Sequence, residues 1–283
     1  MDKFILRGVL SGALGGLIAF VFARIFAEPQ IQAAIDYEEG RGAAQEKLDK
    51  AAGIAVSGHE HEIFSRTIQA SLGIGVGMIL LGAALGAIFA VVFAVCLGRV
   101  GKLKARSLAL LLAGGGLVGF YLVPFVKYPA NPPAVGNADT IGARTGLYLA
   151  MVVCSLLFLV LAVFLGRKLQ ARLGAWSASL VSGAAFIVAV GIVMLILPSL
   201  GELPANVAAF GHHATETPLP LTDPDGAIVY PGFPADVLAD FRLYSVGAQV
   251  IIWGTIGLVF APLADRLLTR LGTTAATKAT ANA

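Results

Sequence analysis

The sequence has 283 residues, of which 57% are hydrophobic and only 13% are charged, against roughly a quarter charged in an average soluble protein. A water-soluble surface cannot be built from so few charges, so the composition excludes a chain made of ordinary soluble domains. The net charge of +3 says little by itself, and no nucleic-acid partner is expected. The partner that the composition predicts is the lipid bilayer.

Uncharged stretches long enough to cross a bilayer define the expected helices, since a span needs about 20 mostly apolar residues. A further candidate near the N-terminus carries Arg7 and Arg24 close to its ends, where long side chains can reach the headgroups. We therefore predict an all-α bundle of about six transmembrane helices in a single domain, 1–270, followed by a flexible cytoplasmic tail, 271–283. The predicted spans are 4–26, 67–97, 107–126, 145–166, 174–198 and 243–264.

The first predicted span has a rival interpretation as a cleaved signal peptide, because Lys3 and Arg7 form a basic start. The small-residue pattern of a cleavage site is poor, however. Gly8, Gly12 and Gly16 recur at four-residue spacing, which favours close helix packing. Similar pairs follow at Gly73/Gly77 and Gly82/Gly86, so a tightly packed bundle is expected.

Charge in the connecting loops predicts the orientation. The 98–106 and 166–175 loops carry lysine and arginine without any acid, and short basic loops stay cytoplasmic. Both termini are therefore expected inside the cell. The three remaining loops, 27–66, 127–143 and 202–242, would face outward; the first and third are long and acidic, and the first is expected to be partly helical and to lie on the membrane.

All four histidines fall in the two acidic outer loops. Imidazole mixed with carboxylate suits borderline divalent metals such as cobalt, nickel and zinc, whereas calcium or magnesium prefers oxygen ligands. Capture of such a cation outside the cell is one interpretation, and solvated surface residues are the other. The candidate ligands are His59, His61, Glu60, Glu62, His212 and His213. The stretch from Asp223 to Gly226 is predicted to be a plain turn and not a calcium loop.

Polar side chains gather near the expected outer ends of the spans and in the 127–143 loop, which predicts an outer vestibule. Helix capping and interhelical hydrogen bonds would explain the same residues without function; Asp139 or Thr140, for example, would cap the fourth span. The expected lining consists of Arg66, Gln69, Asn131, Asn137, Asp139, Arg144, Arg242 and Gln249.

The 127–145 region carries a family resemblance, with Lys127-Tyr-Pro-Ala-Asn-Pro-Pro followed by Val135-Gly-Asn137 and Asp139-Thr-Ile-Gly-Ala-Arg144-Thr145. Together with Glu28-Pro29, Phe64-Ser-Arg66 and Phe233-Pro-Ala-Asp236, it resembles the CbtA family, the A subunit of predicted bacterial cobalt transporters. The resemblance implies a cobalt permease subunit of the bacterial inner membrane that works with a small, single-span, histidine-bearing B subunit and supplies cobalt for cobalamin synthesis. It supports His59 and His61. The 201–232 loop is longer than the family pattern, so His212 and His213 rest on their chemistry alone.

The leading interpretation is thus a membrane subunit for divalent transition-metal uptake, with cobalt(II) as the transported ion and no tightly bound cofactor. The alternative is a non-transporting scaffold or receptor that delivers the ion to a partner. An enzyme is not expected, because the spans contain no candidate nucleophile or acid/base pair. An intrinsic ATPase is not expected either, because the sequence has no Gly-x-x-x-x-Gly-Lys-Ser/Thr loop.

Overall fold

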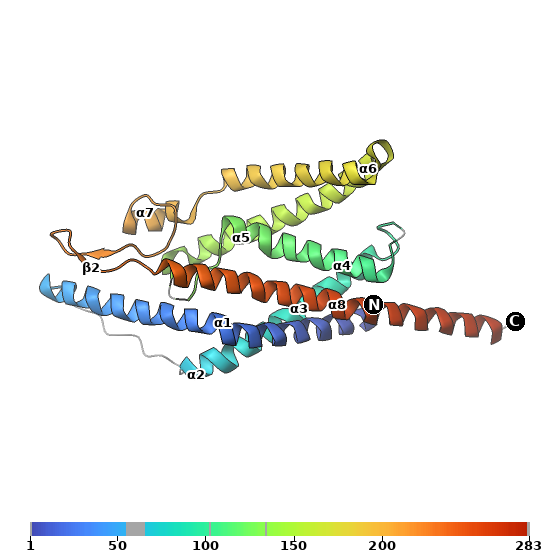
Figure 1. Ribbon diagram of the computed structural model, residues 1–283, viewed down its shortest axis with the longest axis horizontal. Coiled ribbons are helices and arrows are strands. Elements are labelled where there is room, and N and C mark those ends of the chain that lie inside the picture. Colours follow the sequence, from blue (N-terminus) through green and yellow to red (C-terminus); the bar gives the residue numbers. More distant parts are fainter. Residues whose placement is uncertain (1, 55–65, 102, 134, 282–283) are drawn as a thin grey trace. The chain divides into compact units, whose positions relative to one another are not determined.

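The computed structural model describes residues 2–54, 66–101, 103–133 and 135–281, and about 82% of the structure is helical (Figure 1). Five of the described helices are long and apolar enough to cross a membrane. The prediction of an all-α integral membrane protein is confirmed. The number of crossings and the face on which each loop lies stay predictions.

The first helix, α1 (Asp2–Ala51), runs far beyond the predicted first span and includes much of the predicted first loop. Pro29 lies inside it and removes one backbone hydrogen bond. The helix continues because residues 30–51 are rich in alanine, glutamate, glutamine and lysine, which favour helices. Side-chain pairs one turn apart add support, including Gln32 with Asp36 and Lys50 with Glu46. The 27–51 part of the expected loop is therefore a continuation of the first span's helix.

The structure divides into two compact units. Unit 1 comprises 1–25, 63–118 and 246–283, and unit 2 comprises 26–62 and 119–245. Unit 1 contains the N-terminal half of α1, α2 (Arg66–Ile68), the π-helix η1 (Gln69–Gly73), α3 (Ile74–Cys96), α4 (Ala105–Gly116) and most of α8 (Ala235–Ala281).

Close contact between α1 and α3 holds unit 1 together, as the glycine spacing predicts. A Cβ atom added at Gly12 would collide with the carbonyl oxygen of Gly82, and one at Gly8 would collide with that of Gly86. Only glycine lets two helix backbones approach this closely. The Gly73/Gly77 pair does not contribute, because a Cβ atom added at Gly77 would meet no atom of another described segment within 4 Å.

Phenylalanine side chains fill the centre of unit 1. Phe260 of α8 packs edge-on against Phe89 and Phe93 of α3, with ring centroids 5.1 and 5.0 Å apart. Phe4 of α1 lies 5.6 Å from Phe93. Phe93 and Phe260 are fully buried. The unit is therefore held by apolar and aromatic packing, which suits a bundle in a bilayer.

Unit 2 contains the predicted fourth and fifth spans as two arms of α6 (Ile141–Ile196). The chain turns back at Gly174, whose φ of 75° and ψ of 168° are not helical (Figure 1). A positive φ is readily adopted only by glycine. Met151 on one arm and Val190 on the other pack with Tyr128 in one buried cluster.

Five short helical elements and a hairpin make up most of the remaining described residues of unit 2. The third span ends in the π-helix η2 (Leu117–Leu122) and α5 (Val123–Lys127), and η3 (Ala138–Thr140) leads into α6. After α6 come η4 (Leu200–Glu202), α7 (Pro204–Phe210) and the antiparallel strands β1 (Leu221–Thr222) and β2 (Ile228–Tyr230). Asp223 accepts hydrogen bonds from the backbone N–H groups of Asp225 and Ala227, which confirms the predicted turn.

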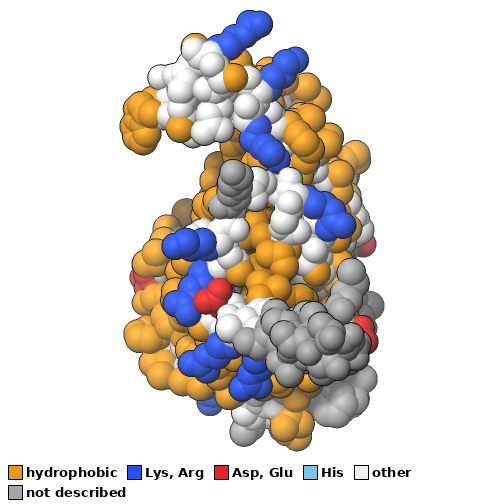
Figure 2. Space-filling view, turned by 90° about the vertical axis from the view of Figure 1, so that its right-hand side faces the viewer, with side chains coloured by type: hydrophobic (Ala, Val, Ile, Leu, Met, Phe, Trp, Pro, Cys, Tyr) orange, Lys and Arg blue, Asp and Glu red, His pale blue; other side chains and the backbone are white. Residues whose placement is uncertain are grey.

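Large hydrophobic side chains lie on the surface of the helices. Leu80 of α3, Leu195 of α6 and Leu258 of α8 are each more than 60% exposed. Figure 2 shows hydrophobic side chains over much of the face that it presents, with lysine and arginine side chains among them. Such a surface is unfavourable in water and favourable in lipid.

Candidate functional site

The polar side chains of unit 2 converge where η3 meets the first turn of α6. Asn137 precedes η3, and its side-chain oxygen accepts a hydrogen bond from the backbone N–H of Asp139 at 3.0 Å. Thr140 occupies the N-cap position of α6 but makes no capping bond with its side chain. The expected cap by Asp139 or Thr140 is therefore wrong, because Asn137 caps η3 and the Thr140 hydroxyl has other partners.

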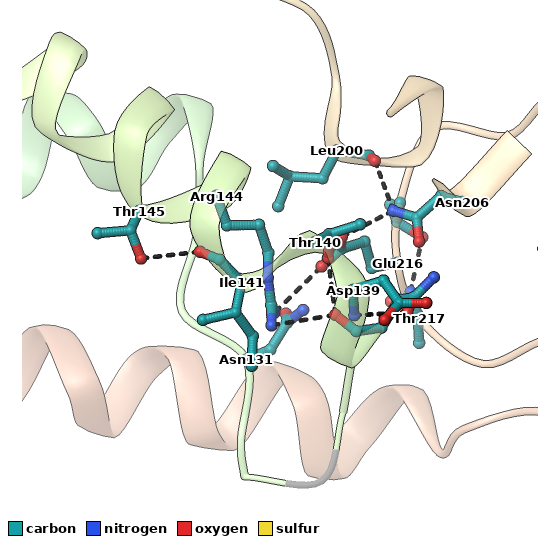
Figure 3. Close-up of polar contacts among 12 residues, drawn as sticks. Asn131, Asp139, Thr140, Ile141, Arg144, Thr145, Leu200, Asn206, Glu216 and Thr217 are labelled. Carbon is teal, nitrogen blue, oxygen red and sulfur yellow. Dashed lines mark hydrogen bonds and ion pairs between the residues drawn. The ribbon is translucent and has the colours of Figure 1, made fainter. Parts of the chain in front are cut away.

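Glu216 is the centre of this cluster, and its side chain is fully shielded from solvent. Its Oε1 accepts hydrogen bonds from the Thr140 hydroxyl at 2.5 Å and from the Asn206 side-chain amide at 2.7 Å. Its Oε2 lies 3.1 Å from Nη1 of Arg144. Figure 3 shows the three side chains pointing toward the carboxylate from η3, α6 and α7.

The cluster joins segments that are far apart in the sequence. Asn206 of α7 also donates to the carbonyl of Leu200, so the 200–217 segment is tied to itself as well as to α6 (Figure 3). Asn206 is fully buried. A buried carboxylate is costly unless it is paired and hydrogen-bonded, and Glu216 has both kinds of partner. The charge of Glu216 is therefore compensated, whereas the side-chain oxygen of Asn206 is buried without a hydrogen-bond partner among the described residues.

Close packing at Gly136 limits how Arg144 can move. Gly136 has a φ of +131°, and an added Cβ would lie 2.6 Å from Nη1 of Arg144 and 3.2 Å from Oε2 of Glu216. A residue with a side chain would be strained there and would press on the ion pair. The backbone of the 127–143 loop thus helps to hold the Arg144 guanidinium in place.

A cavity of about 570 Å³ opens beside Arg144 within unit 2. Its walls come from the end of the third span, the proline-rich loop and the first turns of α6. Tyr128 is buried, and burial raises the pKa of its hydroxyl, which stays protonated and donates to the carbonyl of Pro198 at 2.8 Å. The lining includes Tyr121, Phe125, Pro132, Tyr148 and Leu149.

Arg242 fixes the proline-rich loop from the side of α8. Its Nε donates to the carbonyl of Ala130 at 3.2 Å, and its Nη2 donates to the side-chain oxygen of Asn131 at 2.9 Å. Asn131 also lines the cavity. The loop is therefore held in one conformation by an arginine fork as well as by its prolines.

The structure brings together part of the predicted vestibule. Asn131, Asn137 and Arg144 lie in or next to the cavity of unit 2, and Arg242 contacts its wall. Asp139 is exposed. The other predicted members, Arg66, Gln69 and Gln249, belong to unit 1 and are not part of this cluster.

His212 and His213 follow α7 and make separate contacts. Nδ1 of His212 lies 2.8 Å from Oε2 of Glu202, and Nδ1 of His213 lies 2.7 Å from the carbonyl oxygen of Gly211. Both partners are acceptors, so in each neutral ring Nδ1 carries the proton and Nε2 keeps a free lone pair. A histidine that binds a metal commonly has its second nitrogen held in this way.

The described part of the chain contains no group of three or more histidine, cysteine, aspartate or glutamate side chains close enough to hold a metal ion. His59, His61, Glu60 and Glu62 lie outside the described residues. The metal ligands expected from the sequence therefore stay a prediction.

Glu216, Thr140 and Asn206 were not predicted as site residues. The sequence marks Glu216 only as one of several acids in the third outer loop, and nothing local distinguishes it from its exposed neighbours. Arg144 offered the available signal. Asp139 is the only acid within five residues of this arginine, so an ion pair with a carboxylate from a distant segment was open to it.

Comparison with known protein families gives a match over most of the chain. The model of a family described as "Probable cobalt transporter subunit (CbtA)" matches residues 1–265. No curated protein and no solved structure matches the chain. The matched region includes all of unit 2, with the cavity and the Glu216 cluster, and unit 1 up to residue 265.

Proposed function

Because the chain belongs to the CbtA family of probable cobalt transporter subunits, we propose that it is the membrane subunit of a cobalt(II) uptake system and captures the ion at extracytoplasmic histidine and carboxylate side chains. The family match over residues 1–265 carries this proposal. The captured ion then passes through the helix bundle. The chain is a multi-pass membrane protein, and we place it in the bacterial inner membrane with both termini in the cytoplasm.

The geometry of the third outer loop supports the capture step. His212 is 76% exposed and presents a free Nε2, while Glu202 holds its other nitrogen. Borderline divalent cations bind imidazole well, and a carboxylate behind the ring strengthens the ligand. In the described residues, no three histidine, cysteine, aspartate or glutamate side chains lie close enough together to hold a metal ion. The other ligands of a captured ion must therefore come from water, from the 59–62 stretch or from a partner.

A partner is implied by the family description, which names a subunit. We propose that it is a small, single-span B subunit that carries histidines. It would supply ligands next to the loop and take part in transfer. The chain itself is proposed to be neither an enzyme nor an ATPase.

The apolar interior of the spans favours a second candidate function. Among the described residues, the buried polar groups within the predicted spans include the serines Ser11, Ser155 and Ser182, the Tyr121 hydroxyl and the Trp253 indole nitrogen, and no carboxylate or imidazole. Serine hydroxyls are weak ligands for a dehydrated divalent cation. A non-transporting scaffold or receptor would fit this interior, since it would capture the ion and deliver it to a partner that forms the path.

Uptake of radioactive cobalt separates the two functions. Cells that express this chain alone should take up cobalt above background if it forms the path, and uptake should rise further with the small partner. A scaffold would give binding to isolated membranes but no uptake without the partner. Competition by nickel and zinc in the same assay would give the metal preference, since the general affinity order does not favour cobalt over either.

Variants of the loop test the capture step within this assay. His212→Ala/His213→Ala should lower uptake at limiting cobalt, and His59→Ala/His61→Ala should lower it more, because both the chemistry and the family resemblance support the latter pair. Thr222→Ala, an exposed uncharged position in the hairpin of the same loop, is the matched control and should leave uptake unchanged. Unchanged uptake in both histidine variants would mean that the histidines are solvated surface residues and do not take part in capture.

A further inference from the structure

The cavity of unit 2 has a composition that does not suit a cation. Of the described residues that line it, Arg144 alone carries a charge, and the rest are mainly aromatic rings, prolines and aliphatic side chains. Its volume of about 570 Å³ is far larger than a single ion requires. The cavity therefore differs in chemistry from the proposed capture site near His212.

Most polar groups in the cavity wall already have partners. The Tyr128 hydroxyl donates to Pro198, and the Tyr148 hydroxyl donates to the carbonyl of Phe120 at 3.3 Å. The side-chain oxygen of Asn131 accepts a bond from Arg242. These groups orient the wall and offer little to a ligand.

Arg144 is different, because a guanidinium has five N–H donors and the structure uses few of them. Nη1 faces the Glu216 carboxylate, and Nη2 makes a long contact of 3.5 Å with the carbonyl oxygen of Asn137. The Arg144 side chain is 27% exposed, whereas that of Glu216 is fully buried. A molecule in the cavity can therefore reach the cation but not the carboxylate that balances it.

We propose that this cavity binds an amphipathic oxyanion, with a phosphate or carboxylate group on Arg144 and an apolar body along the tyrosine and proline walls. Planar, forked N–H donors match the oxygens of phosphate and carboxylate groups. Two sources share this chemistry: the headgroup region of a phospholipid and a soluble organic acid.

Glu216 acts in this site as a positioning residue. Its carboxylate fixes the direction of the guanidinium and offsets its charge, and the bonds from Thr140 and Asn206 keep the carboxylate in place. Removing only the negative charge should strengthen binding of an anion. If the Arg144–Glu216 ion pair had a purely structural role, removing that charge would disturb the local fold. Binding of the anion would then become weaker.

Binding to the full chain, purified in a neutral detergent, tests the proposal with three labelled probes. Phosphatidylglycerol represents the lipid source, 3-phenylpropionate represents a soluble organic acid with an apolar body, and diacylglycerol has the apolar body without the oxyanion. Saturable binding of phosphatidylglycerol above that of diacylglycerol, or saturable binding of 3-phenylpropionate, supports the site and identifies its source. Binding of phosphatidylglycerol no tighter than that of diacylglycerol, together with no binding of 3-phenylpropionate, overturns it.

Three variants locate the binding at Arg144. Glu216→Gln, which can still accept a bond at its amide oxygen, should bind the oxyanion about tenfold more tightly. Arg144→Gln/Glu216→Gln removes both charges without leaving either one buried alone, and should bind about tenfold more weakly than the unchanged protein. Arg172→Gln, an exposed position remote from the cavity in sequence, is the matched control and should bind like the unchanged protein. Weaker binding by Glu216→Gln would assign the pair a structural role only and overturn the proposal.

Discussion

Arg144 and Glu216 form an ion pair in which Nη1 and Oε2 are 3.1 Å apart, although one residue begins a predicted span and the other lies in the loop that follows the next span. The two other partners of Glu216, Thr140 and Asn206, come from η3 and α7. One carboxylate thus ties three elements of unit 2 together. Its contacts also set the direction of the guanidinium that faces the cavity.

The first prediction concerns stability. Glu216→Ala should destabilise the protein strongly, by about 3 to 5 kcal/mol, because it leaves Arg144, Thr140 and Asn206 without their common partner. Glu216→Gln should cost less, since the amide keeps an acceptor for Thr140 and Asn206. Thermal unfolding of the purified protein in detergent, followed by circular dichroism, measures both changes.

Glu39→Ala is the control for this comparison, because Glu39 is an exposed acid on α1 of the same unit. Its melting temperature should stay within about a degree or two of that of the unchanged protein, as expected for a surface substitution. If Glu216→Ala melted like this control, the cluster would contribute nothing to the fold.

Much of the helical framework could be predicted from the sequence because a bilayer imposes a simple rule. Long stretches without charge must be helices, and the stretches at 67–97 and 107–126 correspond closely to Gln69–Cys96 and Ala105–Lys127. The Gly8 and Gly12 spacing likewise predicted a close helix contact, which α1 and α3 make. These features depend on local pattern alone.

The Glu216 cluster could not be predicted in the same way. Nothing near Glu216 in the sequence shows that it is buried, since it lies in a polar loop between threonines and its partners are distant. A helix within the 27–66 loop was predicted, but its continuity with the first span was not, because a proline such as Pro29 directly after a span is typical of a loop. Tertiary packing and good helix propensity overrode both signals.

The second prediction tests the contact between α1 and α3. Gly12→Ala should lower the melting temperature clearly, because its methyl group would collide with the backbone of α3 at Gly82. Gly77→Ala is the matched control on α3, since a Cβ atom added there would meet no atom of another described segment within 4 Å. That change should be neutral or slightly stabilising, by up to about 1 kcal/mol, as alanine is the better helix former. Equal effects of the two substitutions would contradict the packing.

The third prediction concerns topology. Single cysteines are placed in a background in which Cys96 and Cys154, both free, are replaced by alanine. Ala214→Cys should react with an impermeant thiol reagent added to intact cells, and Lys104→Cys should react only after the cells are opened. Both positions are exposed, so accessibility within the fold does not bias the result. The reverse pattern would move His212 to the cytoplasm and remove the basis for capture outside the cell.

The last prediction is a pH dependence that follows from competition between protons and metal for the same ring nitrogen. A histidine in a model peptide has a pKa near 6.5, and only its neutral form binds a metal, so capture by histidine should weaken as the pH falls from about 7 to 5.5. Carboxylates have reference pKa values near 4 and would keep their affinity over that range. Cobalt binding to the purified protein should therefore fall in this window.

His212→Ala/His213→Ala and His59→Ala/His61→Ala should each lose part of this pH dependence. The pair that contributes more to cobalt binding should lose the larger part. A flat profile for the unchanged protein would mean that acidic side chains concentrate the cation without any histidine ligand, and the loops would then act through charge alone.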